Sequence, residues 1–311
     1  MTYLKLLLTS VFWGGTFIAG KWVSLNVDPY SAAFLRFFIA SFFLIFLTLK
    51  IEGRLPGISL GKLLIIIILG LTGVFSYNLF FFSGLSYIQA NRASLIIACN
   101  PIFISLCSVL FFKEHLNILK IIGLCLSVAG ALIVISKGNL FGIFESGIGK
   151  GELLIFGCVI SWVAYSILGK KAMNDMSPIV SVCYSSIAGT VMLFFPAIKN
   201  NVFTNLPAYT ALEWTSLFYL GFFGTVLGFF WYYEGIKDIG PLKAGIFINF
   251  VPISAIIMSF FILDEPLTIS LMVGAVLVIA GVFLTNAAHG GNRGKIDFRR
   301  DNSKFLNDKN K

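Results

Sequence analysis

Ten apolar stretches, each long enough for one membrane-crossing helix, run through this chain of 311 residues. A helix needs roughly 20 apolar residues to cross the hydrocarbon core of a bilayer. Most of the breaks between the stretches are short and polar or contain Gly and Pro, so consecutive helices are expected to be antiparallel neighbours. The sequence therefore predicts an all-α integral membrane protein with ten transmembrane helices, at residues 4–23, 31–50, 63–84, 93–112, 117–136, 151–170, 178–198, 213–234, 244–263 and 268–287.

The charge content also indicates that lipid is the solvent for most of the chain. Charged residues make up 12% of the sequence, against about 25% in soluble domains, and the mean hydropathy is +0.91. A net charge of +9 would suggest a nucleic-acid partner in a soluble protein. Here the basic residues lie mainly in short loops and the C-terminal segment, so we expect contact with membrane lipid and none with nucleic acid.

The distribution of Lys and Arg predicts the orientation. Of the 23 Lys and Arg residues, 17 fall on one side of the predicted membrane and 4 on the other, with Lys21 and Arg36 inside spans. Basic loops favour the cytoplasmic side, so both termini of this cell-membrane protein are predicted to be cytoplasmic.

Residues 4–23 are expected to be a retained first helix, because no convincing small-x-small cleavage site follows. Residues 288–311 form a basic tail without apolar periodicity and are expected to be disordered.

The second half of the chain repeats the first. At a shift of 151 residues the halves align without a gap over a long stretch, and the matched pairs are Gly84 with Gly235, Pro101 with Pro252 and Glu114 with Glu265, among others. The expected units are residues 1–137 and 150–287, each with five spans. Because five is an odd number, the second copy enters the bilayer from the opposite side, which makes the units inverted repeats.

Inverted repeats indicate a function class. They are a recurring plan among secondary transporters, in which a site at the repeat interface opens to either membrane face in turn. We therefore expect a carrier that moves a small organic solute by alternating access, driven by the gradient of the solute or by protons. A homodimer is left open by the sequence.

Several motifs resemble one known group of carriers. Residues 13–17 read WGGTF, residues 29–37 read PYSAAFLRF, and the fourth helix of each half ends in a related segment, FKEHL at 112–116 and LDEPL at 263–267. In these motifs the chain resembles the drug/metabolite transporter superfamily, in its EamA-like branch of ten-helix proteins. The resemblance implies transport of a metabolite such as an amino acid, with export common in that branch. A multidrug or other solute permease is the alternative.

Polar and aromatic residues near mid-span are the candidate substrate-binding residues. An amide such as Asn100 or Asn249 lies close to a proline that frees a backbone carbonyl, although the same amides could simply bond between helices. Deep tryptophans do not belong to the interfacial aromatic belt and suit a cavity wall. The candidates are Trp13, Thr16, Tyr77, Asn78, Asn100, Trp162, Tyr165, Trp231 and Asn249.

Two cations near the outer ends of the first two spans have three possible roles. Lys21 and Arg36 could reach the headgroups, cap the carbonyls of a helix end, or form a mouth that attracts an anionic substrate. In the second half no Arg stands where Arg36 would map, near residues 183–185. The matched Glu114 and Glu265 are best explained as carboxylates that complement a helix dipole, with proton coupling as the alternative.

Other function classes find little support in the residues. An enzyme needs clustered carboxylates, metal-ligand histidines or a nucleophile with its base, whereas the two histidines, His115 and His289, lie at a helix boundary and in the tail. A channel usually has charge rings or a filter loop, and neither pattern is present. The prediction is a transporter without a cofactor or metal. A channel and a structural membrane protein are the less favoured alternatives.

Overall fold

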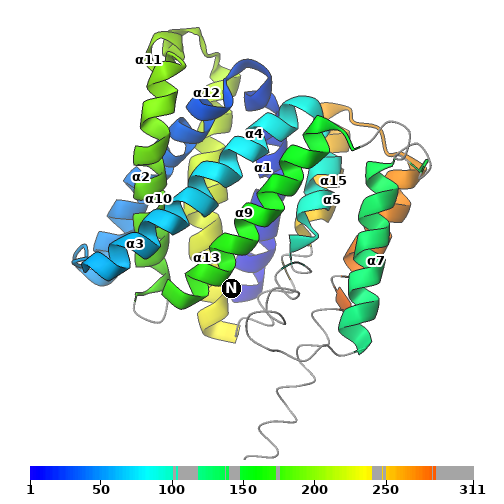
Figure 1. The fold of residues 1–311 in the computed structure, drawn as a ribbon, viewed down its shortest axis with the longest axis horizontal. Coiled ribbons are helices and arrows are strands. Elements are labelled where there is room, and N and C mark those ends of the chain that lie inside the picture. Colours follow the sequence, from blue (N-terminus) through cyan, green and yellow to red (C-terminus); the bar gives the residue numbers. More distant parts are fainter. Residues whose placement is uncertain are drawn as a thin grey trace, which may run out of the picture.

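In the computed structural model of the chain, the described residues are 1–100, 103, 118–136, 138–139, 148–172, 176–239, 247, 250–281 and 283–284. Within these ranges every regular element is a helix (Figure 1). The predicted tail at 288–311 lies outside the described residues.

The first half of the chain contributes two long helices, one long interrupted helix and two further helices. In the interrupted helix, α3 runs into α4 through a π-helical segment, η1. The elements are α1 (Thr2–Asn26), α2 (Pro29–Glu52), α3 (Leu60–Leu69), η1 (Gly70–Ser76), α4 (Tyr77–Tyr87), α5 (Ala90–Ile97) and α7 (Ile118–Ile135).

The second half has a similar series, again with a π-helical segment inside its third long helix. The elements are α9 (Lys150–Ala172), α10 (Pro178–Lys199), α11 (Val202–Asn205), the 3-10 helix η2 (Leu206–Ala208), α12 (Ala211–Phe218), η3 (Tyr219–Leu227), α13 (Gly228–Ile239) and α15 (Phe250–Leu263). A further apolar helix follows at Ile269–Gly281.

Six helices in the described part of the chain are long and apolar enough to cross a membrane. Each falls on one of the predicted stretches. Of the other four stretches, 93–112 overlaps the end of α5, and the remaining three contain α7, α15 and the helix at Ile269–Gly281. The count of ten spans stays a prediction. The six helices are Thr2–Asn26, Pro29–Glu52, Leu60–Tyr87, Lys150–Gly169, Pro178–Lys199 and Ala211–Tyr232.

Local sequence explains where α2 begins and ends. The Asp28 carboxylate accepts hydrogen bonds from the backbone N–H groups of Tyr30 and Ser31, and Pro29 is the first helical residue. Such a cap satisfies donors that have no partner inside the helix. At the other end Gly53 adopts a left-handed φ of 71°, a conformation that costs glycine little and stops the helix.

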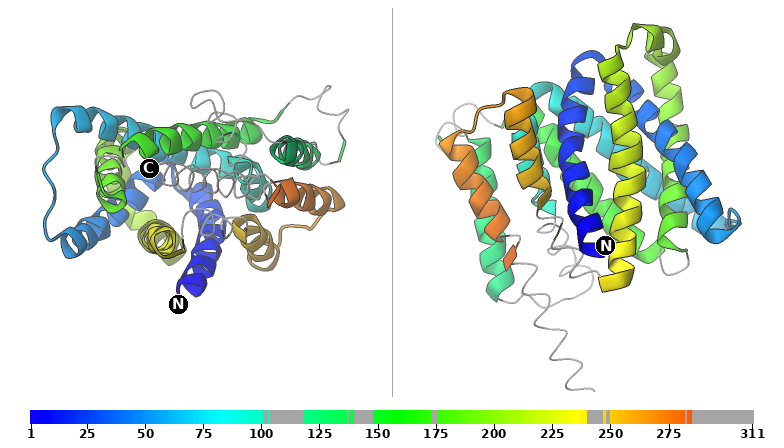
Figure 2. Two further views of the ribbon diagram at one scale, coloured as in Figure 1. Left: turned by 90° about the horizontal axis from the view of Figure 1, so that it is seen from below. Right: turned by 180° about the vertical axis from the view of Figure 1, so that it is seen from behind.

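The helices of the two halves interleave rather than form separate bundles. α2 packs on α10, α4 packs on α9, and α1 packs on both α13 and α15. Figure 2 shows α13 and α15 on either side of α1 in both views. A functional site at the centre of this bundle is therefore built from both halves.

Close approaches between the halves occur in matching pairs. A Cβ at Gly70 would lie 3.0 Å from the carbonyl oxygen of Ser185, and a Cβ at Gly221 would lie 2.9 Å from that of Arg36. Gly221 follows Gly70 by 151 residues, and Ser185 follows Arg36 by 149. In the same way, a Cβ at Gly84 would meet Ile155 and a Cβ at Gly235 would meet Leu6. Gly235 follows Gly84 by 151 residues, and Ile155 follows Leu6 by 149. Small residues at these points let the helices pack closely.

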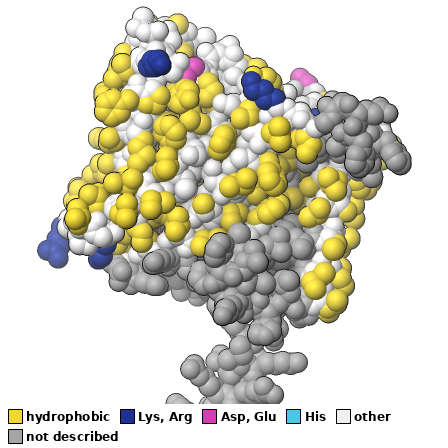
Figure 3. Space-filling model, viewed as in Figure 1, with side chains coloured by type: hydrophobic (Ala, Val, Ile, Leu, Met, Phe, Trp, Pro, Cys, Tyr) yellow, Lys and Arg dark blue, Asp and Glu magenta, His cyan; other side chains and the backbone are white. Residues whose placement is uncertain are grey.

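The flank of the bundle exposes large apolar side chains. Phe42, Phe46 and Phe195 are each at least 65% exposed, and Figure 3 shows hydrophobic side chains over much of the flank with Lys and Arg toward its upper and lower margins. A water-soluble protein rarely exposes so large an apolar area. The flank therefore suits contact with lipid.

Candidate functional site

A cavity of about 420 Å³ lies among helices of both halves. Its volume falls in the range of small-molecule sites, roughly 300–1,000 Å³. Seven of the nine candidate binding residues line it, and they come from α1, α4, the segment after α5, and α9. These seven are Trp13, Thr16, Tyr77, Asn78, Asn100, Trp162 and Tyr165.

Aromatic rings form a continuous series along the cavity. Tyr77 packs on Trp162 with ring centroids 5.5 Å apart, and Trp162 contacts Phe229 at 6.3 Å. Phe229 contacts Trp13 at 5.7 Å, and Trp13 contacts Tyr232 at 5.4 Å. Tyr77 and Trp13 belong to the first half and Trp162, Phe229 and Tyr232 to the second, so any relative movement of the halves would change the shape of this wall.

One cation belongs to the described lining of the cavity. Arg36 is 8% exposed, and its Nη1 donates to the amide oxygen of Asn78 at 2.9 Å. Its Nη2 donates to the hydroxyl of Thr225 at 3.4 Å. Asn78 in turn donates to the carbonyl of Val74 at 2.8 Å. Both side-chain partners of this buried guanidinium are neutral.

The π-helical segment η3 helps to fix the position of Trp13. The indole Nε1 of Trp13 donates to the carbonyl of Gly224, within η3, at 2.9 Å. The Thr225 hydroxyl donates to the Leu220 carbonyl, five residues earlier, at 2.9 Å. π-helical turns are rare and often occur at functional sites, and here one supplies partners for both Trp13 and Arg36.

Asn100 offers a free acceptor at the cavity. The side chain is 8% exposed and lines the cavity, and its Oδ1 has no hydrogen-bond partner among the residues that the structure describes. A buried amide oxygen without a partner is costly. A bound solute that carries an N–H or O–H group would satisfy it.

Three predicted residues are placed elsewhere or not described. Trp231 stacks on Phe12 with centroids 5.6 Å apart and does not line the cavity. Lys21 donates to the carbonyls of Leu85 at 2.6 Å and Ile88 at 2.9 Å, at the end of α4. Among the three possible roles of Lys21, these contacts favour that of a helix cap. Asn249 lies outside the described residues, so its role as a binding residue stays a prediction.

Several lining residues were not among the candidates, and three of them contact Arg36 or Trp13: Thr225, Phe229 and Tyr232. One signal in the sequence would have found Phe229, because it follows Asn78 by 151 residues. Thr225 has no such signal, since its importance comes from the contact with Arg36. Tyr232 neighbours the predicted Trp231 and takes its place in the lining.

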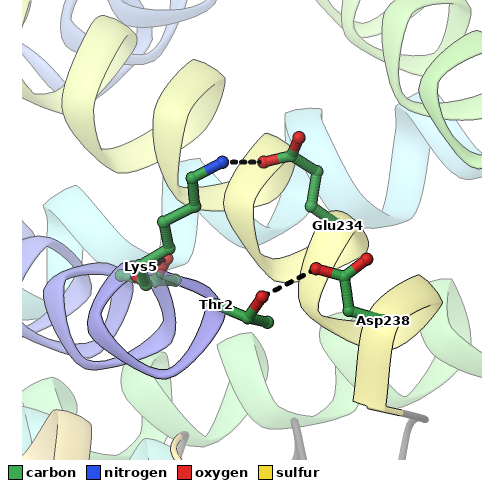
Figure 4. Close-up of polar contacts among 5 residues, drawn as sticks. Thr2, Lys5, Glu234 and Asp238 are labelled. Atoms are coloured by element: carbon green, nitrogen blue, oxygen red, sulfur yellow. Dashed lines mark hydrogen bonds and ion pairs between the residues drawn. The ribbon is translucent and has the colours of Figure 1, made fainter.

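Polar contacts join the halves near the start of α1. Lys5 forms an ion pair with Glu234 at 2.7 Å, and the Thr2 hydroxyl donates to Asp238 at 2.7 Å (Figure 4). The Lys5 and Glu234 side chains are 33% and 36% exposed. Exposed pairs of this kind contribute about 0–1 kcal/mol, so this contact can break at little cost.

More deeply buried contacts join the halves near the end of α1. The Glu265 carboxylate accepts from the backbone N–H of Ala90 at 2.7 Å and of Asn91 at 3.0 Å, at the start of α5. Arg92 pairs with Glu152 at 2.9 Å, with side chains 12% and 10% exposed. Glu265 thus complements the positive end of a helix dipole. Glu114, its counterpart in the repeat, lies outside the described residues.

The comparison with protein families identifies the chain. The model of the EamA-like transporter family matches residues 1–136 and 149–287. The chain belongs to this family, and with its apolar helices it is a multi-pass membrane protein that functions as a transporter.

Similar proteins carry transporter names. The chain is 30% identical over 280 residues to the uncharacterized transporter YyaM of Bacillus subtilis, covering 90% of this chain and 92% of that protein. It is 29% identical over 286 residues to an uncharacterized transporter of Archaeoglobus fulgidus, covering 92% and 97%. A solved crystal structure matches the fold with a TM-score of 0.62 at 18% identity, covering 91% of this chain and 96% of that one.

Proposed function

We propose that this protein is a secondary carrier that binds a small organic metabolite in the central cavity and exports it by alternating access between two inverted repeats. The observation that carries the proposal is the cavity itself, whose aromatic wall is shared by Trp13, Trp162 and Phe229 from both halves. Both termini lie in the cytoplasm in this proposal, and the driving force is the gradient of the solute or of protons.

The paired glycine contacts support the inverted repeats. If two copies are related by a two-fold axis, a contact from the first copy to the second must recur with the copies exchanged. Gly70 with Ser185 and Gly221 with Arg36 follow this rule at the offsets of the sequence repeat. The π-helical segments η1 and η3 also occur at corresponding places, Gly70–Ser76 and Tyr219–Leu227.

Contacts at the two ends of the cavity-forming helices support alternating access. The Lys5–Glu234 ion pair joins the halves near the start of α1, while Glu265 joins them near the end of α1. Each contact can close one path to the cavity. A carrier must break the contacts at one end of α1 while it keeps those at the other end.

Uptake into proteoliposomes tests the proposal. The purified protein is reconstituted and offered pooled metabolites, with and without a pH gradient. A carrier saturates and shows counterflow, in which a trapped solute drives uptake of its labelled form. Uptake that rises linearly with concentration and shows no counterflow would indicate a channel. The variants Trp13→Ala and Asn100→Leu should impair uptake at normal membrane levels, and unchanged uptake in both would show that the site lies elsewhere.

A further inference from the structure

The environment of Arg36 indicates the charge of the transported solute. Arg36 lies in α2, about two turns from its start, and lines the central cavity. A guanidinium stays protonated in proteins. Its side chain is buried, so its charge must be balanced by groups that face it.

The described protein groups do not balance this charge. A guanidinium has five N–H donors, and Arg36 uses one toward Asn78 and one toward Thr225, both neutral. Its Nε is buried and has no partner among the described residues. The described lining of the cavity contains no Asp or Glu. The cavity thus presents a buried cation with unused donors.

An anionic group of the solute is the natural complement. A buried charge is retained only where it is paired and hydrogen-bonded, and charged residues inside membrane helices usually mark a substrate path. A carboxylate matches the planar fork of a guanidinium. In the described lining Arg36 is the one Lys or Arg residue, so a solute group with a single negative charge balances its charge. A dianionic phosphate would leave one negative charge without a partner.

The rest of the lining selects the body of the solute. The rings of Trp13, Tyr77, Trp162 and Phe229 offer apolar faces in the same cavity. A cavity of about 420 Å³ suits a small molecule. We infer, on the basis of the proposed function, that the cargo is a small organic acid with one carboxylate and an apolar body, and that the carboxylate pairs with Arg36 while the body packs on the aromatic wall.

The test uses the full-length protein in proteoliposomes. The pooled-metabolite screen is sorted by charge at pH 7 into solutes with a carboxylate, including zwitterionic amino acids, and neutral or cationic solutes without one. Each solute with saturable uptake is then measured with Arg36→Gln, Arg36→Lys and the control Arg54→Gln, since Arg54 is exposed in the loop after α2. Detergent-solubilised samples of each variant are checked for thermal stability.

We expect every solute with saturable uptake to carry a carboxylate. Arg36→Gln should raise KM by at least roughly thirtyfold, because it removes one partner of a buried charge pair. Arg36→Lys should have a smaller effect, since it keeps the charge but loses the fork, and Arg54→Gln should match the wild type. The charge sorting needs no variant, so it decides the question even if Arg36→Gln does not fold.

Two results would overturn the inference and leave the proposed function standing. One is saturable uptake with counterflow of a solute that has no carboxylate. The other is a folded Arg36→Gln variant whose KM stays within about threefold of the wild type for a carboxylate solute. If no solute in the screen shows saturable uptake or counterflow, the proposed function itself fails, and the inference fails with it.

Discussion

Trp13 and Trp162 meet across a single ring, since both pack on Phe229, with centroid distances of 5.7 Å and 6.3 Å. The two tryptophans occupy corresponding positions in the two halves, 149 residues apart. Each therefore brings its own half of the chain to the same cavity. In the proposed mechanism, a movement of one half relative to the other would therefore reshape this pocket.

Truncating the side chain of Trp13 should weaken binding of the transported solute. Trp13→Ala removes a ring from the cavity wall and the hydrogen bond from Nε1 to the Gly224 carbonyl, and we expect KM to rise about tenfold, which corresponds to ~1.4 kcal/mol. Trp13→Phe keeps an aromatic face and should have a smaller effect. Trp214→Ala is the control, because Trp214 is 38% exposed and outside the cavity lining. Equal uptake kinetics in all three variants would contradict the prediction.

Replacing Asn100 separates binding from stability. Asn100→Leu removes a buried oxygen that has no partner among the described residues, so thermal stability should stay equal or rise. If the amide accepts a hydrogen bond from the cargo, KM should nevertheless increase by about three- to tenfold. Asn91→Leu is the matched control. The side-chain amide of Asn91 is also buried and has no partner among the described residues, but it does not line the cavity. A purely structural amide would show no KM change in either variant.

Lys21 should matter for stability rather than for affinity. Its amine caps the carbonyls of Leu85 and Ile88, and hydrogen bonds from a charged donor contribute about 1.5–3 kcal/mol each. Lys21→Met should therefore lower the thermal midpoint of the purified protein while KM stays within about twofold. Lys50→Met, at an exposed position in the last turn of α2, is the control. A raised KM with unchanged stability would instead favour the role of an anion-attracting mouth.

The Lys5–Glu234 ion pair should control turnover. Lys5→Glu places two negative charges where an ion pair was, which should favour opening of this end by about 1 kcal/mol. We expect maximal transport rate to fall by about fivefold with little change in KM. The charge swap Lys5→Glu with Glu234→Lys restores the attraction and should restore most of the rate. A double variant as slow as the single one would show that the pair does not act as a latch.

The sequence was sufficient to predict much of the helical plan and the centre of the site. Apolar length alone located the six long helices that the structure describes, because lipid requires long uninterrupted apolar helices. Trp13 and Trp162 could be found because tryptophans deep in a span lie outside the interfacial aromatic belt, and Tyr77 because it is a polar residue near mid-span. All three line the cavity.

The direction of individual side chains was harder to predict. An α-helix turns by about 100° per residue, so Trp231 and Tyr232 face different neighbours, and only Tyr232 reaches the cavity. The π-helical segment η3 precedes both and changes the helical phase. The partners of Lys21 are backbone carbonyls, which a residue pattern does not reveal.

The central claim is that the cavity faces each side of the membrane in turn, and cysteine accessibility tests it most directly. Ala98 lines the cavity, and Ala98→Cys is placed in a variant without the five native cysteines. A membrane-impermeant thiol reagent is then applied from one side or the other of oriented vesicles, with and without the transported solute. The account predicts that the cysteine reacts from both sides and that the solute slows both reactions. Reaction from one side only under every condition would contradict it.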